Sequence, residues 1–217
     1  MGHPAGPLFR VDAVCFDLLT ALLDSWTLWE TVAAEAGYPG RGRPWREDAL
    51  RRVTASGDYR PYDELVREGA LSVGLPPDLA GRLLARWGGL RPWPEVPAML
   101  ARLRARPRLP LATATNCPEA LARLGSAALG NPFAVIVSAE RAGAYKTDPR
   151  PYRLALAELG LPPGRVLFVA GSPHDIGGAA RVGMPVLWAN RLNLPPPSDA
   201  RAAAILPDLT ALPDLIA

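Results

Sequence analysis

Short apolar runs alternate with segments of helical spacing along most of the chain. Five runs rich in β-branched or aromatic residues end abruptly in polar ones, and they cover residues 11–16, 109–114, 133–137, 165–170 and 185–189. Between them, segments 119–124 and 151–159 repeat apolar side chains with the period of a helix. Alternating strands and helices are typical of a parallel sheet with helices on both faces. The pattern therefore predicts an α/β fold.

The stretch 25–91 departs from this alternation, because it contains helical patterns and no convincing strand. It predicts a helical lobe inserted between the first two strands, of a kind that can close over a sheet edge and exclude water. We therefore expect a core domain of residues 1–24 and 92–217 and a cap domain of residues 25–91. Helical spacing places three tryptophans in the core of the lobe, namely Trp26, Trp29 and Trp87.

Polar residues follow four of the predicted strands. Asp17 comes after the first run, Thr115 and Asn116 after the second, Lys146 after the third and Ser172 after the fourth. Because ligands bind outside the carboxyl ends of parallel strands, we expect these side chains to share one edge of the sheet. Lys146 is the only lysine among 24 basic residues. A compact ammonium with tunable proton affinity suits a reaction site better than the planar fork of arginine.

Composition and charge narrow the function classes. Apolar residues make up 49% of the 217 positions and charged residues 21%, as in ordinary globular proteins. The net charge of +3 comes from arginines such as Arg102, Arg104 and Arg106, which stand among alanine and leucine at helical spacing. This pattern predicts solvated helix faces rather than a nucleic-acid surface, and it is compatible with a small anionic substrate.

Cysteine usage and hydropathy bear on location. Cys15 lies in an apolar run and Cys117 follows Asn116, so the two predict neither a disulfide framework nor a metal site. No histidine pairs with Cys117 by motif, and we expect it to be a small packed side chain. The sequence also has no signal peptide pattern and no apolar run long enough for a membrane span. We expect a cytoplasmic protein without a membrane partner.

Residues 16–24, Phe-Asp-Leu-Leu-Thr-Ala-Leu-Leu-Asp, resemble the first motif of the haloacid dehalogenase superfamily. Thr115, Lys146 and Asp175 fall where the other three motifs belong, so the resemblance covers nearly the whole chain. It implies a Rossmann-like parallel core with an inserted α-helical cap. In that superfamily the aspartate after the first strand is a nucleophile that forms a covalent ester, and Asp17 takes this position. A purely structural role for Asp17, capping the next turn, is the alternative.

Two departures favour one branch of the superfamily. Phosphatases carry a second aspartate two residues after the nucleophile, where this chain has Leu19, and a Mg²⁺-binding aspartate in the fourth motif, where it has Gly171. Without these oxygens Mg²⁺ would be held poorly. The resemblance therefore implies a 2-haloacid dehalogenase that needs no metal or other cofactor, since a halide leaves without a proton. A Mg²⁺-dependent small-molecule phosphatase remains an alternative.

The resemblance also assigns roles around the nucleophile. Lys146 would keep Asp17 ionised, and Asp175 would direct water at the ester. Arg46, in a Trp45-Arg46 pair, would meet the departing halide, although a solvated helix arginine is the alternative. The remaining candidates would contact the substrate, the leucines through their backbone amides: Leu18, Leu19, Thr115, Asn116, Tyr152, Trp45 and Ser172. For Tyr152 a packing role, and for Asp175 a helix-capping role, are the alternatives.

Other positions depart from the dehalogenase pattern as well. The usual Gly-Thr after the nucleophile is Thr20-Ala21 here, which moves or removes a hydroxyl that steadies the site. In the fourth motif, stretch 170–172 replaces the usual serine and asparagine, and His174, which could act as a base or be an exposed loop residue, replaces a tryptophan. These changes support a third possibility, a catalytically weak binding protein of the same fold. The resemblance also implies a homodimer.

Overall fold

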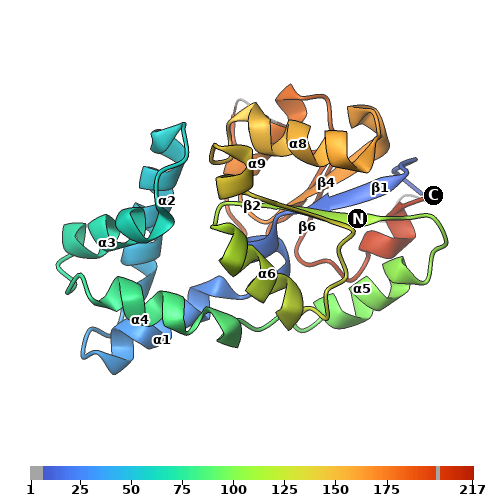
Figure 1. The fold of residues 1–217 in the computed structure, drawn as a ribbon. Helices are drawn as coiled ribbons and strands as arrows, with labels where there is room; N and C mark the ends of the chain where they lie inside the picture. The colour runs from blue at the N-terminus through green and yellow to red at the C-terminus, as the bar shows by residue number, and fades with distance from the viewer. Residues whose placement is uncertain (1–6, 199–200) are drawn as a thin grey trace.

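The computed structural model describes residues 7–198 and 201–217, and its centre is a six-stranded parallel sheet with helices on both faces (Figure 1). The order along the sheet is β3-β2-β1-β4-β5-β6, and every neighbouring pair is parallel. The strands are β1 (Ala13–Phe16), β2 (Leu111–Thr115), β3 (Val135–Ser138), β4 (Val166–Ala170), β5 (Val186–Ala189) and β6 (Ala204–Leu206). The predicted α/β fold with a Rossmann-like parallel core and an inserted helical cap is confirmed.

Helices fill the connections between the strands. Five of them lie between β1 and β2: α1 (Ser25–Glu35), α2 (Gly42–Ser56), α3 (Tyr62–Ser72), α4 (Leu79–Ala85) and α5 (Val96–Arg104). The others are α6 (Glu119–Ala128), α7 (Ala139–Ala142), α8 (Pro149–Leu159) and α9 (His174–Arg181). Short turns are η1 (Leu18–Leu22), η2 (Trp87–Gly89), η3 (Pro163–Arg165) and η4 (Leu212–Leu215).

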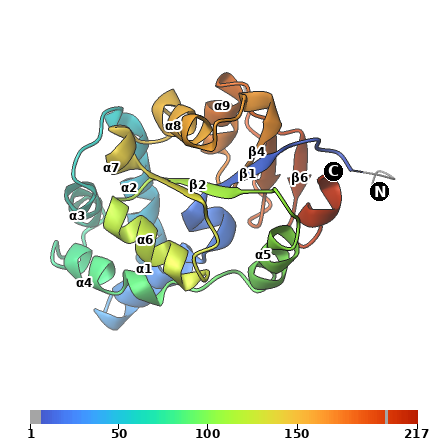
Figure 2. The ribbon, with the colours of Figure 1, turned by 45° about the vertical axis from the view of Figure 1, so that its right-hand side comes forward.

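The sheet is covered on both faces, which explains why its strands read as continuous apolar runs. Helices α8 and α9 lie on one face and α5 and α6 on the other (Figures 1 and 2). Along β1, Ala13 and Cys15 belong to one buried apolar cluster, while Val14 and Phe16 belong to the other. Successive strand side chains point to opposite faces, so a doubly covered strand is apolar at most of its positions. Strand β1 therefore lies in the middle of a sheet that is covered on both faces, and Asp17 follows directly at its end.

The sixth strand is the element that the hydrophobic pattern missed. Strand β6 has three residues and pairs with β5 at the edge of the sheet. Its middle residue, Ile205, is 45% exposed. A short and partly exposed edge strand presents no buried apolar run, and that run was the signal used for the other strands.

Helices α1 to α4 form a lobe beside the sheet, at the left of Figure 1. Within residues 25–91, all of which the structure describes, no strand is present. The chain enters and leaves the lobe side by side, where the N–H of Asp24 donates to the carbonyl of Arg91 at 2.8 Å and Leu23 pairs with Pro92. We propose the division between core and cap at these residues. The first six residues of the expected core range lie outside the described residues.

The three tryptophans of the cap lie in two different environments. Trp29 and Trp87 are 2% and 0% exposed and lie in the core of the lobe, as predicted. The prediction for Trp26 is wrong, because its ring is only half-buried and stacks on the guanidinium of Arg46, with 3.7 Å between the ring centroid and Cζ. Helical spacing does not distinguish a side chain in the core of a lobe from one at the edge of that core.

Close packing of α1 on α2 sets the position of the cap side chains. A Cβ at Gly42 would collide with the backbone of Trp29 and Glu30 in α1. We expect Gly42→Ala to lower the free energy of unfolding by about 1–3 kcal/mol, since the helices must separate to admit the methyl group. Urea denaturation followed by circular dichroism measures this. Gly81→Ala in α4, where the new Cβ meets nothing within 4 Å, is the control and should be neutral or stabilising. Equal stability of both variants would contradict the prediction.

Candidate active site

Asp17 stands at the carboxyl end of β1 and at the start of η1. Its Oδ2 accepts hydrogen bonds from the backbone N–H groups of Thr20 and Ala21, at 2.9 and 3.2 Å, and from the Thr20 hydroxyl. Capping of the turn, which was the structural alternative for Asp17, is therefore real, but it occupies only one carboxylate oxygen. The hydroxyl of Thr20 stands one position before the threonine of the usual dehalogenase motif, and it still reaches the Asp17 carboxylate.

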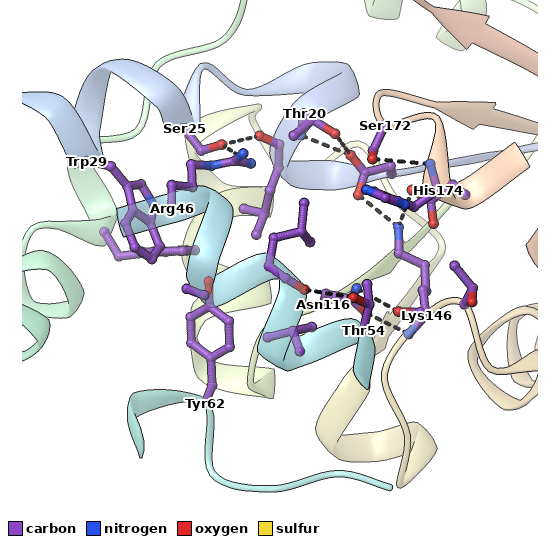
Figure 3. Close-up of a pocket in the computed structure, with 18 residues that line it drawn as sticks. Thr20, Ser25, Trp29, Arg46, Thr54, Tyr62, Asn116, Lys146, Ser172 and His174 are labelled. Atoms are coloured by element: carbon purple, nitrogen blue, oxygen red, sulfur yellow. Dashed lines mark hydrogen bonds and ion pairs between the residues drawn. The ribbon is translucent and has the colours of Figure 1, made fainter. Parts of the chain in front are cut away.

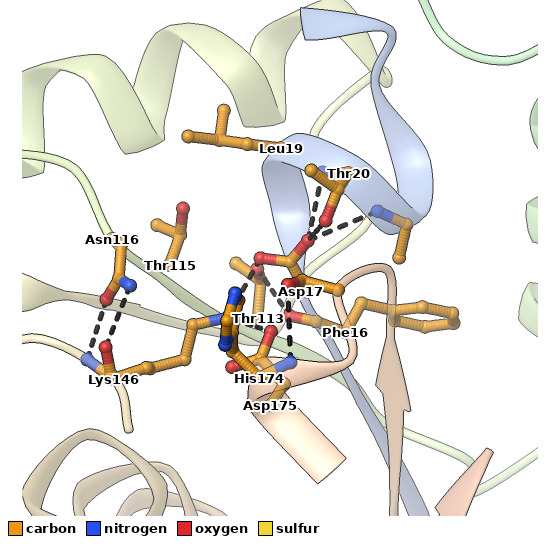
Figure 4. A network of polar contacts seen from close by, with 12 residues as sticks. Phe16, Asp17, Leu19, Thr20, Thr113, Thr115, Asn116, Lys146, His174 and Asp175 are labelled. Atoms are coloured by element: carbon orange, nitrogen blue, oxygen red, sulfur yellow. Dashed lines mark hydrogen bonds and ion pairs between the residues drawn. The ribbon is translucent and has the colours of Figure 1, made fainter. Parts of the chain in front are cut away.

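Lys146 joins two buried carboxylates (Figure 4). Its Nζ donates to Oδ1 of Asp17 at 2.8 Å and to Oδ2 of Asp175 at 3.0 Å, and its side chain is 2% exposed. The backbone of Lys146 is held by Asn116, whose side chain accepts from its N–H at 2.7 Å and donates to its carbonyl at 3.0 Å. Asn116 therefore positions the lysine, and both of its polar groups are already engaged.

Asp175 lies in the first turn of α9, which begins at His174 after an N-cap at Pro173. The capping role considered for Asp175 is wrong, because its carboxylate points into the network. Besides Lys146, it accepts a hydrogen bond from the hydroxyl of Tyr152 at 2.8 Å. Tyr152 is fully buried and its ring presses against Gly178, where a Cβ would collide with it. Tyr152 thus holds the Asp175 carboxylate in position through this hydrogen bond.

The charges in this cluster separate the two carboxyl groups. Burial opposes ionisation of Asp17, but the charge of Lys146 and the hydrogen bonds from Lys146 and Thr20 outweigh it, so the pKa of Asp17 lies below its ordinary value. For Asp175, burial and the nearby charge of Asp17 outweigh Lys146, so its pKa is raised. Burial would lower the pKa of Lys146, yet its two carboxylate partners raise it. One carboxylate is therefore kept ionised while the other can take up a proton.

A small cavity of about 60 Å³ opens on this cluster, between the carboxyl edge of the sheet and the cap (Figure 3). Of the expected site residues, it is lined by Asp17, Leu19, Arg46, Asn116, Lys146, Ser172 and Asp175. His174 also lines it; the side chain is exposed, as expected, but it begins α9 rather than standing in a loop. The cavity brings together residues from both the core and the cap.

Four expected contacts do not line this cavity, namely Leu18, Trp45, Thr115 and Tyr152. Trp45 packs edge-on against Trp29 and donates its indole N–H to the carbonyl of Val66 at 2.8 Å. A helix turns by about 100° per residue, so Trp45 faces the lobe core when its neighbour Arg46 faces the sheet. Thr115 is buried against Cys117, and Leu18 lies in the apolar core. These side chains shape the site without reaching its interior.

Cys117 is packed, as predicted, and is not a nucleophile. It is fully buried, and burial raises the pKa of its thiol to about 12. A thiol with such a pKa is almost entirely protonated at neutral pH, whereas the thiolate is the reactive form.

Arg46 reaches the cavity from α2 and is 7% exposed. The solvated-arginine alternative is therefore wrong. Its Nη2 donates to the hydroxyl of Ser25 at 2.9 Å and its guanidinium stacks on Trp26, while Nη1 has no hydrogen-bond partner among the residues that the structure describes. Burial lowers the pKa of Arg46 to about 10, so it remains a cation at neutral pH. A buried cation with a free N–H is suited to receive an anion.

Sequence reasoning missed Ser25 and the stacking role of Trp26. Neither belongs to a recognisable motif, and both act only because α1 crosses α2 beside Arg46. The sequence pattern of a single helix cannot predict where another helix crosses it. The hydroxyl of Ser25 also donates to the carbonyl of Leu19 at 2.6 Å, which ties the start of the cap to the turn after Asp17.

The departures at Thr20 and Gly171 are physically linked. A Cβ at Gly171 would collide with the backbone of Thr20 and Ala21 and with the Thr20 hydroxyl. No side chain fits at position 171 while the turn after Asp17 keeps this conformation, and Leu19 supplies no oxygen either. Across the residues described, no group of three or more His, Cys, Asp or Glu is placed to hold a metal ion. The donors that would bind Mg²⁺ in a phosphatase of this superfamily therefore do not fit here.

Comparison with known proteins agrees with this geometry. The family model described as haloacid dehalogenase-like hydrolase matches residues 11–183. The chain belongs to this family. It is 32% identical over 196 residues to an (S)-2-haloacid dehalogenase of Pseudomonas putida, which covers 83% of this chain and 86% of the relative. It is also 29% identical over 202 residues to a phosphoglycolate phosphatase of Rhodospirillum rubrum, with 79% and 83% covered.

Solved structures of the family superpose over almost the full chain. The L-2-haloacid dehalogenase from Xanthobacter autotrophicus matches with a TM-score of 0.83 and 26% identity, covering 95% of this chain and 98% of that one. Its structure with covalently bound chloropropionic acid matches with a TM-score of 0.79, at the same identity and coverage. The helices of this family member are too short or too polar to cross a membrane, as far as its residues are described.

The buried network predicts a pH-dependent loss of stability when Lys146 is removed. Lys146→Met leaves Asp17 and Asp175 buried without a cation, and we expect the free energy of unfolding to fall by about 3–5 kcal/mol at neutral pH. Their folded-state pKa values would then lie above the unfolded ones, so the deficit should shrink as the pH falls and the carboxyls protonate. Urea titrations at neutral and mildly acidic pH measure this.

The double variant Asp17→Asn, Lys146→Met is the control, because it removes one of the two like charges. It should recover part of the lost stability at neutral pH. A deficit in Lys146→Met that does not change with pH would show that lost packing, rather than unpaired charge, is responsible.

Proposed function

We propose that this protein is a metal-independent 2-haloacid dehalogenase in which Asp17 is the nucleophile. The observation that carries the proposal is the presence, on one small cavity, of a buried, ionised carboxylate on Asp17 and of an N–H of Arg46 that has no partner among the described residues. A displacement at carbon needs a carboxylate at one end and a place for the departing anion at the other.

The two carboxylate oxygens of Asp17 have different hydrogen-bond donors, and we assign them different roles in the reaction. Oδ2 already accepts three hydrogen bonds, from two backbone N–H groups and the Thr20 hydroxyl, whereas Oδ1 accepts only from Lys146. Oδ1 therefore keeps a lone pair for attack. In the first step, the bond between Oδ1 and C2 of the substrate forms as the bond between C2 and halogen breaks. The halide leaves with the electron pair toward Arg46, and the configuration at C2 inverts.

The second step hydrolyses the ester. Asp175 takes a proton from water, and the hydroxide attacks the carbonyl carbon of the Asp17 ester. The carbonyl oxygen is then Oδ2, so the three donors that held the free carboxylate now stabilise the tetrahedral oxyanion. Collapse of this intermediate breaks the bond between Cγ and Oδ1, and the departing alkoxide takes the proton from Asp175 to give a 2-hydroxy acid that carries Oδ1. The Asp17 carboxyl is left with Oδ2 and the oxygen of the water, and it releases its proton to solvent. Ser172 and His174 line the cavity beside Asp175 and can adjoin this water.

The inner cavity sets the size of the acid that fits beside Asp17. At 10–15 Å³ for each water-sized group, about 60 Å³ admits roughly four to six non-hydrogen atoms. Chloroacetate and 2-chloropropionate have this size. The backbone amides of Leu18 and Leu19 and the side chain of Ser172 are our proposed contacts for the substrate carboxylate.

The alternatives fit the site less well. A phosphatase is favoured by one relative, but Leu19 and Gly171 supply neither an acid for the leaving oxygen nor Mg²⁺ ligands. A catalytically weak binding protein was suggested by the change at Thr20, and the Thr20 hydroxyl nevertheless holds Asp17. A homodimer and a cytoplasmic location stay proposals, supported by the family resemblance and, for the location, by the free buried cysteines Cys15 and Cys117.

Removing the nucleophile tests the proposal most directly. We expect halide release from racemic 2-chloropropionate in the presence of EDTA, and we expect Asp17→Asn to lower the rate by about a thousandfold or more. An ion-selective electrode or a colorimetric chloride assay measures it. Asp63→Asn, at an exposed position of α3, is the control and should keep the wild-type rate. Absence of release from the wild type, with hydrolysis of phosphate esters on addition of Mg²⁺, would favour the phosphatase.

The different pKa shifts of the two aspartates predict how the reaction responds to acid. Asp175, with its raised pKa, is protonated first as the pH falls, while Asp17 stays ionised. Ester hydrolysis should therefore fail at a higher pH than ester formation, and the covalent ester should accumulate as the pH is lowered. Rapid acid quenching followed by mass spectrometry of the intact protein detects it.

Asp175→Asn should accumulate the same ester at neutral pH, because it lacks the base at every pH. If the ester fraction instead fell together with turnover as the pH was lowered, protonation of Asp17 would be responsible for the loss of activity, and this result would contradict the prediction.

A further inference from the structure

A second cavity, of about 390 Å³, lies beside the inner one. Five residues line both cavities, so the two meet at these side chains: Thr20, Arg46, Leu50, Ser172 and His174. The proposed mechanism uses only the inner cavity. The outer cavity therefore needs an explanation of its own.

The walls of the outer cavity are largely apolar and aromatic. Trp26 and Leu50 come from cap helices α1 and α2, Trp93 from the segment that returns from the cap, and Leu192 and Leu194 from the loop after β5. Such a lining favours an apolar group over a second polar ligand, because apolar surface is stabilised when it leaves water.

The charges around this cavity are already compensated. Arg43 pairs with Glu47 at 2.9 Å, Arg51 with Asp48 at 2.5 Å, and Arg191 with Glu95 at 2.5 Å. Among the described residues, no carboxylate forms an ion pair with Arg46, the fourth arginine of the lining. Because Arg46 also lines the inner cavity, this unpaired positive charge lies where the two cavities meet.

The outer wall is anchored to the turn that carries the nucleophile. The indole N–H of Trp93 donates to the carbonyl of Thr20 at 3.1 Å, and Nη2 of Arg191 donates to the carbonyl of Ala21 at 2.9 Å. The guanidinium of Arg191 also lies 4.9 Å from the centroid of the Trp93 ring. A group held against this wall is thereby held in a fixed relation to Asp17.

We propose that the outer cavity binds a bulky apolar substituent on C2 of the substrate, so that the substrate class includes 2-haloacids with a side chain of several carbons. This inference rests on the proposed dehalogenase function. An acid of two or three carbons fills the inner cavity, and the five shared residues mark where a larger group on C2 can extend into the outer cavity. Each buried CH₂ there should raise the specificity constant by about fourfold at most.

Two bromoacids that differ only in the length of the side chain test this. For the wild type, we expect kcat/KM for racemic 2-bromohexanoate to exceed that for racemic 2-bromopropionate by about tenfold, because three further carbons become buried. Leu192→Trp fills the outer cavity with a larger ring, and Leu192→Asp places a carboxylate in it. Both variants should lower the ratio of the two specificity constants by about tenfold.

Leu124→Trp is the matched control. Leu124 lies on α6, is 44% exposed against 42% for Leu192, and lines neither cavity. Its ratio should stay within about twofold of the wild type. A wild-type preference for 2-bromopropionate, or a ratio unchanged in both Leu192 variants, would overturn the outer subsite and leave the dehalogenase function intact. No halide from either bromoacid would overturn the function, and the subsite with it.

Discussion

One ammonium group, on Lys146, stands between two carboxylates that are shut away from water. Burying any of these three charges alone would be costly, and they are tolerated together because each compensates another at hydrogen-bonding distance. The surrounding structure serves this arrangement. Strand β1 places Asp17 at the middle of the sheet, α9 brings Asp175 from one side, and the Asn116 side chain fixes the backbone of the lysine. The cap then contributes Arg46 from the opposite wall.

The division of work between the two aspartates follows from their neighbours and not from their chemistry, which is the same. Asp17 receives donors from the turn that it begins, and these favour its ionised form. Asp175 receives fewer donors and faces the charge of Asp17, which favours its protonated form. In the proposed mechanism, the donors on Oδ2 of Asp17 would serve the carboxylate, the ester and the oxyanion in turn, so the site would need little rearrangement between the two half-reactions.

Most of the core could be predicted from the sequence, because a strand buried on both faces is apolar at most positions and ends where polar residues begin. Five strands and the position of Asp17 and Lys146 at one edge of the sheet follow from that rule, whereas Asp175 was found only through the resemblance to the superfamily. The roles of Trp45 and Trp26 could not be assigned in this way. Which of two neighbouring residues on a helix faces a cavity depends on how that helix is rotated against another, and this rotation is set by contacts far apart in the sequence. Strand β6 was not predicted because it is too short and too exposed to contain an apolar run.

The close approach of Gly171 to the turn after Asp17 limits which side chains this edge of the sheet can accept. A Cβ at position 171 would meet the backbone of Thr20 and Ala21 as well as the Thr20 hydroxyl, so a glycine at position 20 would not by itself make room for it. For the same reason, introducing an aspartate at position 171 alone would not create a metal-binding motif. The new side chain would displace the turn that aligns Asp17, so the protein would lose its nucleophile geometry before it gained a metal ligand.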